Sequence, residues 1–151
     1  MSASYVRSLV RLKTEYEAVD ASLRYVQEQW RRQNLPLSIT LATPEALSRA
    51  ISDLPSAYSI RLFSTFEGML REHMAQHHTA LSEDTPAIQL IDRVASLEDN
   101  RVSAQLRDKV HEVRRYRNFL VHAGGTLPLI VAFPDALARL SKFVDKLPEP
   151  H

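Results

Sequence analysis

The chain has 151 residues, of which 44% are hydrophobic and 25% are charged, with no cysteine and a formal net charge of +1. This composition excludes a disulfide-stapled miniprotein, a cysteine-ligated metal site, a membrane-spanning chain and a general polycation. We expect one soluble, all-α domain over residues 1–151, located in the cytoplasm, because the sequence has neither a signal peptide nor a membrane-spanning run.

An apolar stripe predicts a long first helix, from near Tyr5 to Arg32. Its members recur in steps of three and four: Leu9, Leu12, Tyr16, Val19, Leu23, Val26 and Trp30. The stripe suits either packing within a bundle or pairing with a second copy of the helix, and we favour the bundle. The segment 34–40, which contains Pro36, ends this helix.

Two prolines mark the starts of the next two predicted helices. Thr43–Glu45 combines a cap with an N1 proline and starts a short helix to about Asp53. Pro55 starts a second long helix, which runs to about Thr79. Its expected apolar face comprises Ile60, Phe63, Leu70 and Met74. Glu67 is placed at the centre of this face, within about 60° of each of the four.

Three histidines near the end of this helix, His73, His77 and His78, have a spacing that suits a metal ion, because residues four apart on a helix can share one. No cysteine or suitably spaced carboxylate completes a ligand set. We therefore expect an exposed helix end, with no metal and no other cofactor.

Two more helices and a connector complete the predicted order around the motif helix described next. Thr85-Pro86 starts a third helix, to about Glu98, and Pro134-Asp135 starts the last one. Their expected inward residues are Ile88, Ile91, Val94 and Ala95, then Leu137, Leu140, Val144 and Leu147. Leu127–Phe133 is short and apolar, and its prolines favour an extended connector outside any sheet. The expected fold is an all-α, up-and-down bundle of four long helices plus a short one.

The motif helix is predicted from about Arg101 to His122, with Asn100 as its N-cap and Gly124 or Gly125 suited to its stop. On a helical wheel, Arg117 lies inside an apolar stripe. The stripe comprises Leu106, Val110, Val113 and Val121, with Val102 and Leu120 at its edges.

A buried arginine needs a partner, because an unpaired charge in an apolar setting is costly. Glu67 is the residue of opposite charge on the other apolar face. It is either a structural ion-pair partner of Arg117 or the group that orients Arg117 at a functional site, and the two interpretations are compatible.

A mostly basic strip lies beside the apolar stripe. It comprises Arg107, His111, Arg114, Arg115, Asn118 and His122. The acids of this helix, Asp108 and Glu112, lie elsewhere on the wheel. Arg114 and Arg115 lie near the C-terminal end of the helix, where the macrodipole favours positive charge. This does not explain the inward-facing Arg117.

The string from Arg117 to His122, followed by a pair of glycines, resembles the Arg-x4-6-His motif of the HEPN superfamily. Phe66–Glu72 is similar to the FEGxLRE pattern of HEPN proteins associated with RNA cleavage and with toxin or defence systems. Together these stretches cover roughly Tyr58 to His122. In one departure, Gly124 stands where some HEPN toxins that pair with a nucleotidyltransferase carry a tyrosine that becomes modified.

The resemblance implies a metal-independent endoribonuclease in which Arg117, Asn118 and His122 are catalytic and Glu67 supports or orients them. Arg107, His111, Arg114 and Arg115 would bind the RNA. Histidine suits the proton transfers of cleavage by the 2′-hydroxyl, and arginine suits the phosphate charge. The resemblance also implies a homodimer with a shared two-fold cleft, and a toxin or phage-defence role with a cognate antitoxin or immunity partner. The alternatives are a HEPN-like module that binds RNA or a nucleotide without cutting it, and a structural helical adaptor.

Overall fold

The computed structural model of the chain describes residues 3–34, 43–77, 81–82, 84–97, 101–122 and 125–148. Within these ranges the protein has five α-helices and no strand, as the all-α prediction required. The helices are α1 (Ala3–Arg31), α2 (Pro44–His77), α3 (Ala87–Leu97), α4 (Ala104–Val121) and α5 (Phe133–Val144). None of these helices is both long and apolar enough to cross a membrane.

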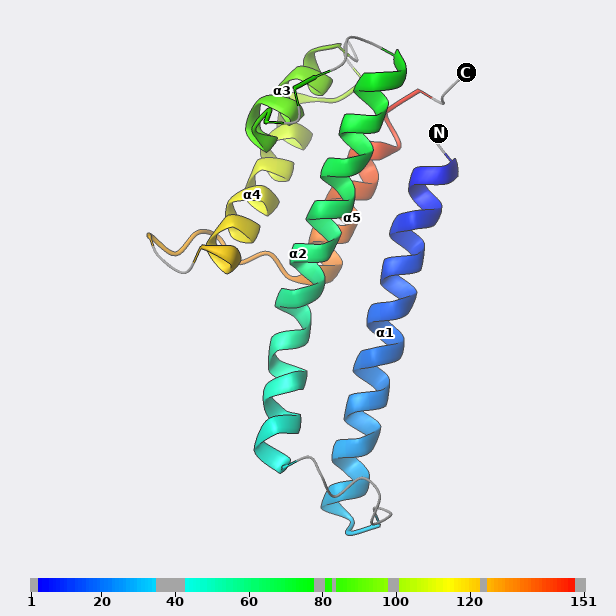
Figure 1. Cartoon of the computed structure of the whole chain (residues 1–151), viewed down its shortest axis with the longest axis vertical. Coiled ribbons are helices and arrows are strands. Elements are labelled where there is room, and N and C mark those ends of the chain that lie inside the picture. Colours follow the sequence, from blue (N-terminus) through cyan, green and yellow to red (C-terminus); the bar gives the residue numbers. More distant parts are fainter. Residues whose placement is uncertain are drawn as a thin grey trace.

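Helix α2 is the central element, because it packs against each of the other four helices. Figure 1 shows α1, α2, α4 and α5 running alternately in opposite directions, with the short α3 beside one end of α2. The core lies where all five helices meet, and it contains Phe63, Phe66, Leu70, Leu90, Leu140 and Phe143, each fully buried. Burial of these side chains supplies the main driving force for the arrangement.

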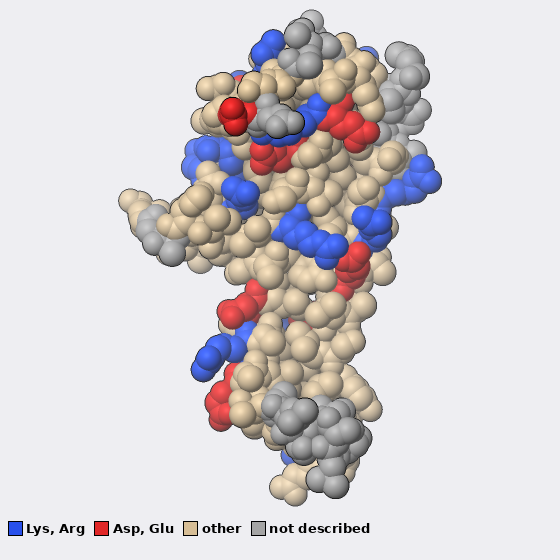
Figure 2. All heavy atoms as spheres, in the orientation of Figure 1, with Lys and Arg blue, Asp and Glu red and all other residues tan. Residues whose placement is uncertain are grey.

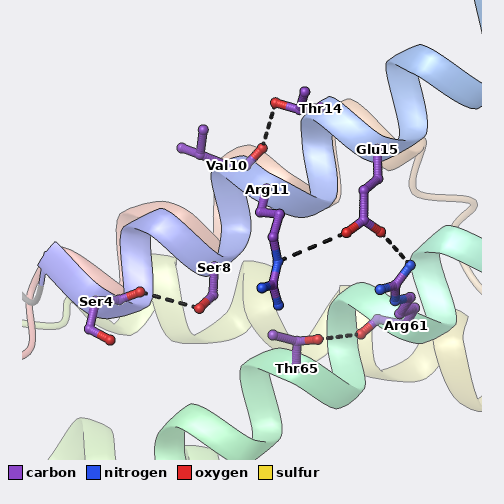
Figure 3. Close-up of polar contacts among 8 residues, drawn as sticks. All are labelled: Ser4, Ser8, Val10, Arg11, Thr14, Glu15, Arg61 and Thr65. Atoms are coloured by element: carbon purple, nitrogen blue, oxygen red, sulfur yellow. Dashed lines mark hydrogen bonds and ion pairs between the residues drawn. The ribbon is translucent and has the colours of Figure 1, made fainter.

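The stripe of α1 packs within the chain, as the bundle interpretation predicted. Leu9 and Leu12 are buried, whereas Val19 is 37% exposed, so burial decreases along the helix. Beyond the level of α5, α1 and α2 continue together as a narrower two-helix arm (Figure 1). In Figure 3, Glu15 of α1 forms an ion pair with Arg61 of α2 at 2.6 Å, while Arg11 approaches the other carboxylate oxygen at 3.9 Å.

The predicted break before Pro55 is wrong, because α2 is one helix that continues through this proline. A proline inside a helix removes one backbone hydrogen bond and costs about 3 kcal/mol. The turns on either side contain the buried Leu47 and Ser59, and α2 packs against α1. This tertiary packing outweighs the local cost. The short and the long predicted helices are therefore a single element of 34 residues.

The inward face of α2 also differs from the expected one. Its buried residues include Leu62, Phe66, Met69 and His73, which lie on one side of the expected face. The centre of the true core face is about 90° from Glu67 on a helical wheel. Glu67 is consequently at the edge of the core, and His73 is fully buried instead of lying at an exposed helix end.

The start of α4 and the inward face of α3 need similar corrections. Ser103, not a residue before Arg101, caps α4, and its hydroxyl accepts the Leu106 N–H at 3.2 Å. The predicted cap, Asn100, lies outside the described residues. In α3 the inward residues are Leu90, Ile91 and Val94, whereas Ile88 is 41% exposed. The connector after α4 is non-helical and contains no strand within 125–132, as predicted.

Candidate functional site

The last turn of α4 carries the motif. The helix ends at Val121, and the backbone N–H of His122 still donates to the Asn118 carbonyl at 2.9 Å. This bond fixes His122 directly after the helix, where its side chain is exposed. Gly125 has a φ of +112°, a conformation that favours glycine, so the chain can turn sharply just beyond the motif.

A shallow cavity of about 300 Å³ opens at this helix end. It is lined by Arg115, Asn118, Phe119, His122, Thr126 and Pro128. Three residues of the predicted site, Arg115, Asn118 and His122, therefore share one concave surface. The connector residues Thr126 and Pro128 form the opposite wall, and the sequence did not predict their part in the site.

Arg117 does not line this cavity but bonds a residue that does. The carbon centre of its guanidinium is 5.8 Å from the centroid of the Phe63 ring, a cation–π geometry, which agrees with its predicted place on the core-facing stripe. Its Nη1 donates to the Asn118 Oδ1 at 3.1 Å. Its Nε is buried and has no hydrogen-bond partner. Arg117 thus reaches the cavity through Asn118, and this bond limits the orientations that the Asn118 amide can adopt.

Glu67 does not pair with Arg117 among the described residues, so the predicted structural ion pair between them is wrong. Its carboxylate instead accepts a hydrogen bond from Arg71 of the same helix at 2.8 Å. The same Arg71 nitrogen also donates to the Thr85 carbonyl at 2.8 Å, which ties α2 to the segment before α3. Glu67 stabilises a helix junction through Arg71, and its predicted role in orienting Arg117 has no direct contact to support it.

The basic strip on α4 is interrupted by an acid from the neighbouring helix. Asp92 of α3 lies 2.8 Å from the His111 Nε2 and 3.8 Å from the Arg107 Nε. Asp92 bonds His111 and lies within ion-pair distance of Arg107, whose Nε has no hydrogen-bond partner, so His111 in particular is less available for RNA than the sequence predicted. Asp92 belongs to a helix that sequence spacing did not align with α4, so no signal within the motif helix pointed to it.

Three arginines close to the helix end have no carboxylate partner in the described part of the chain: Arg114, Arg115 and Arg117. Burial lowers the pKa of Arg114, and the neighbouring charge of Arg115 lowers it further, against a weaker opposite effect of Asp92. The Arg114 Nε is also buried without a hydrogen-bond acceptor. A bound anion would stabilise the positive charges of these guanidinium groups.

The histidines of α2 lie away from this site. The rings of His73 and His77 are 4.8 Å apart, between centroids, and His78 lies outside the described residues. The described residues contain no group of three or more histidine, cysteine, aspartate or glutamate side chains arranged to hold a metal ion.

The connector beyond His122 presents an apolar surface beside the cavity. Leu127, Leu129 and Ile130 are 59%, 62% and 63% exposed, and Val121 is 42% exposed. Residues 119–134 contain no aspartate, glutamate, lysine or arginine. Figure 1 shows the connector projecting from the bundle next to the end of α4, and Figure 2 shows no Lys, Arg, Asp or Glu on the described part of this projection that faces the viewer. Elsewhere on this face, acidic and basic groups are interspersed (Figure 2).

No protein-family model, curated protein or solved structure matches the chain.

Proposed function

We propose that the protein is a metal-independent endoribonuclease of the HEPN type that acts as a two-fold homodimer. The observation that supports this most is the cavity shared by Asn118, His122 and Arg115, with Arg117 bonded to Asn118. One helix end carries a proton-transfer group, an amide and two guanidinium groups that have no carboxylate partner among the described residues. This set suits RNA cleavage by the 2′-hydroxyl.

The reaction forms a bond between the 2′-oxygen and phosphorus and breaks the bond between phosphorus and the 5′-oxygen. A base removes the proton of the 2′-hydroxyl, and an acid gives a proton to the leaving 5′-oxygen. His122 is exposed and free to act in one of these transfers. Arg115 stabilises the charge on the phosphorane, and Asn118 holds a phosphate oxygen or the imidazole. Arg117 orients the Asn118 amide and adds its positive charge close to the phosphate. The products are a 2′,3′-cyclic phosphate and a 5′-hydroxyl.

His122 is the only histidine that lines the cavity in the described part of the chain. Two proton transfers by histidine therefore need a second copy, and a two-fold axis beside the cavity would bring both His122 side chains to one RNA phosphate. The exposed Leu127, Leu129 and Ile130 support this arrangement, because an uncharged apolar surface next to a functional cavity suits an interface. Arg114 and Arg115 would then hold the RNA on either side.

On the motif resemblance, we place the enzyme among toxin or phage-defence effectors that act on cellular RNA, controlled by a cognate antitoxin or immunity partner. The test is growth during induced expression. Wild-type protein should arrest growth, whereas His122→Ala should restore it at equal protein level. Arg49→Ala, an exposed substitution on α2 remote from the motif in sequence, is the matched control and should remain inhibitory.

The hydrogen bond between His111 and Asp92 favours a second candidate function. Asp92 holds this histidine, and in the described part of the chain His122 is then the histidine at the cavity that remains for catalysis. A HEPN-like module that binds RNA or a nucleotide without cutting it would need no more than that. Purified wild-type protein that binds RNA in an Arg115-dependent way but leaves every RNA intact would establish this alternative and exclude the nuclease.

A further inference from the structure

The lysines of this protein are unevenly placed. The sequence contains four, Lys13, Lys109, Lys142 and Lys146, against fifteen arginines. Three of the four line one cavity of about 400 Å³ between α4 and α5. We call this cavity the lysine groove; Arg139 also lines it, and Leu106 and Ala138 supply apolar surface.

Among the described residues, the basic side chains of the lysine groove have few acidic partners. No aspartate or glutamate lines it. Arg139 is paired with Glu112 at 2.6 Å, so one basic group already has a partner. The ammonium groups of Lys109, Lys142 and Lys146 have no ion-pair partner in the described ranges, whereas many surface arginines pair with an acid four residues away. Three like charges around one concavity repel one another unless an anion offsets them.

The type of side chain indicates the type of anion. A lysine ammonium is a compact charge on a flexible stem that adapts to phosphate oxygens in several geometries, whereas arginine favours planar, two-pronged contacts. Three ammonium groups match a ligand with several adjacent negative charges. The apolar surface of Leu106 and Ala138 suits the carbon atoms of a sugar or a base, and the cavity volume lies in the range of small-molecule sites.

We propose that the lysine groove binds a polyphosphate group, carried by a nucleoside polyphosphate or present as inorganic polyphosphate. This inference is independent of the ribonuclease proposal. Lys109 and Asn118 are nine residues apart on α4, which places them about 180° from each other around the helix. The lysine groove and the motif cavity share no residue.

The test is isothermal titration of the purified full chain at fixed ionic strength, with sodium tripolyphosphate and with ATP. Sodium sulfate at matched ionic strength controls for general charge screening. The test variant is Lys142→Ala/Lys146→Ala, and both side chains are exposed, so it should melt at the same temperature as wild type. Lys109→Ala probes the groove from α4, and Lys13→Ala, on the exposed surface of α1, is the matched control.

Wild type and Lys13→Ala should bind tripolyphosphate saturably, and the double variant should bind at least about tenfold more weakly. Lys109→Ala should also weaken binding. Equal affinity for the two ligands would show that the phosphates suffice, and tighter binding of ATP would show that the nucleoside also contacts the groove; both results support the proposal. Absence of binding at millimolar ligand, affinity unchanged in the double variant, or binding through these lysines of an RNA oligomer alone would overturn it.

Discussion

Replacing Arg117 by methionine separates the functional role of this residue from its structural role. Its guanidinium contacts the Phe63 ring and Asn118, yet its Nε is buried without an acceptor and no carboxylate pairs with it in the described part of the chain. Methionine fills a similar volume with a flexible apolar chain and brings no polar group of its own, while the Asn118 Oδ1 loses its donor.

The free-energy terms of this substitution nearly cancel. Loss of the cation–π contact costs about 0.5–1 kcal/mol, and loss of one hydrogen bond costs about 0.5–1.5 kcal/mol. Removal of the unsatisfied buried Nε–H returns about 1–3 kcal/mol. The free energy of unfolding of Arg117→Met should therefore stay within about 1 kcal/mol of the wild-type value, while RNA cleavage is lost.

The assay is urea denaturation followed by circular dichroism at 222 nm, at one protein concentration because dimerisation would add to the measured stability. Arg71→Met is the control, since Arg71 makes an ion pair with Glu67 and a bond to the Thr85 carbonyl. It should destabilise the protein by about 1–2 kcal/mol. A loss of about 3–5 kcal/mol in Arg117→Met, as expected for a broken buried ion pair, would refute this reasoning.

Three further outcomes are expected. His122→Ala should abolish cleavage and leave the melting temperature unchanged, because the side chain is exposed. Cleavage by this variant at the wild-type rate would exclude His122 from the mechanism. Glu67→Gln should lower stability by up to about 1 kcal/mol and keep cleavage, since its partner is Arg71; a larger loss of activity than of stability would restore a role in orienting Arg117. Leu129→Asp/Ile130→Asp should yield folded, inactive monomers in light scattering, and a stable dimer would move the interface elsewhere.

The helical content and most of the inward stripes were predictable because they depend on local periodicity. Leu9 and Leu12 in α1, and Val110 and Val113 in α4, are buried as the spacing indicated. The predicted helix break at Pro55 was wrong because the local cost of the proline is outweighed by the packing of α2 against α1. This packing involves two segments and cannot be inferred from either one alone. The cap of α4 was misplaced for a smaller reason: Ser103 and Asn100 are both good caps, and the turn before the helix decides between them.

The site was predictable where it depends on one helix and unpredictable where it depends on two. Asn118 and His122 share a cavity because residues four apart on a helix lie on the same side. The pairing of Asp92 with His111 depends on how α3 packs against α4. Glu67 and Arg71 are four residues apart on α2, a spacing that allows an ion pair, and their pairing was missed because Glu67 was placed at the centre of the core face. A wheel drawn from four apolar residues of α2 left out Leu62 and Phe66, and so placed Glu67 too far inside.

The central claim concerns the chemistry at His122, and the ends of the RNA products test it most directly. Purified wild-type protein should be incubated with RNA in excess chelator, and the products analysed by mass spectrometry. We predict fragments that end in a 2′,3′-cyclic phosphate and begin with a 5′-hydroxyl, and none of these from His122→Ala. Fragments with 3′-hydroxyl ends, or cleavage that requires added Mg²⁺ or Mn²⁺, would contradict it.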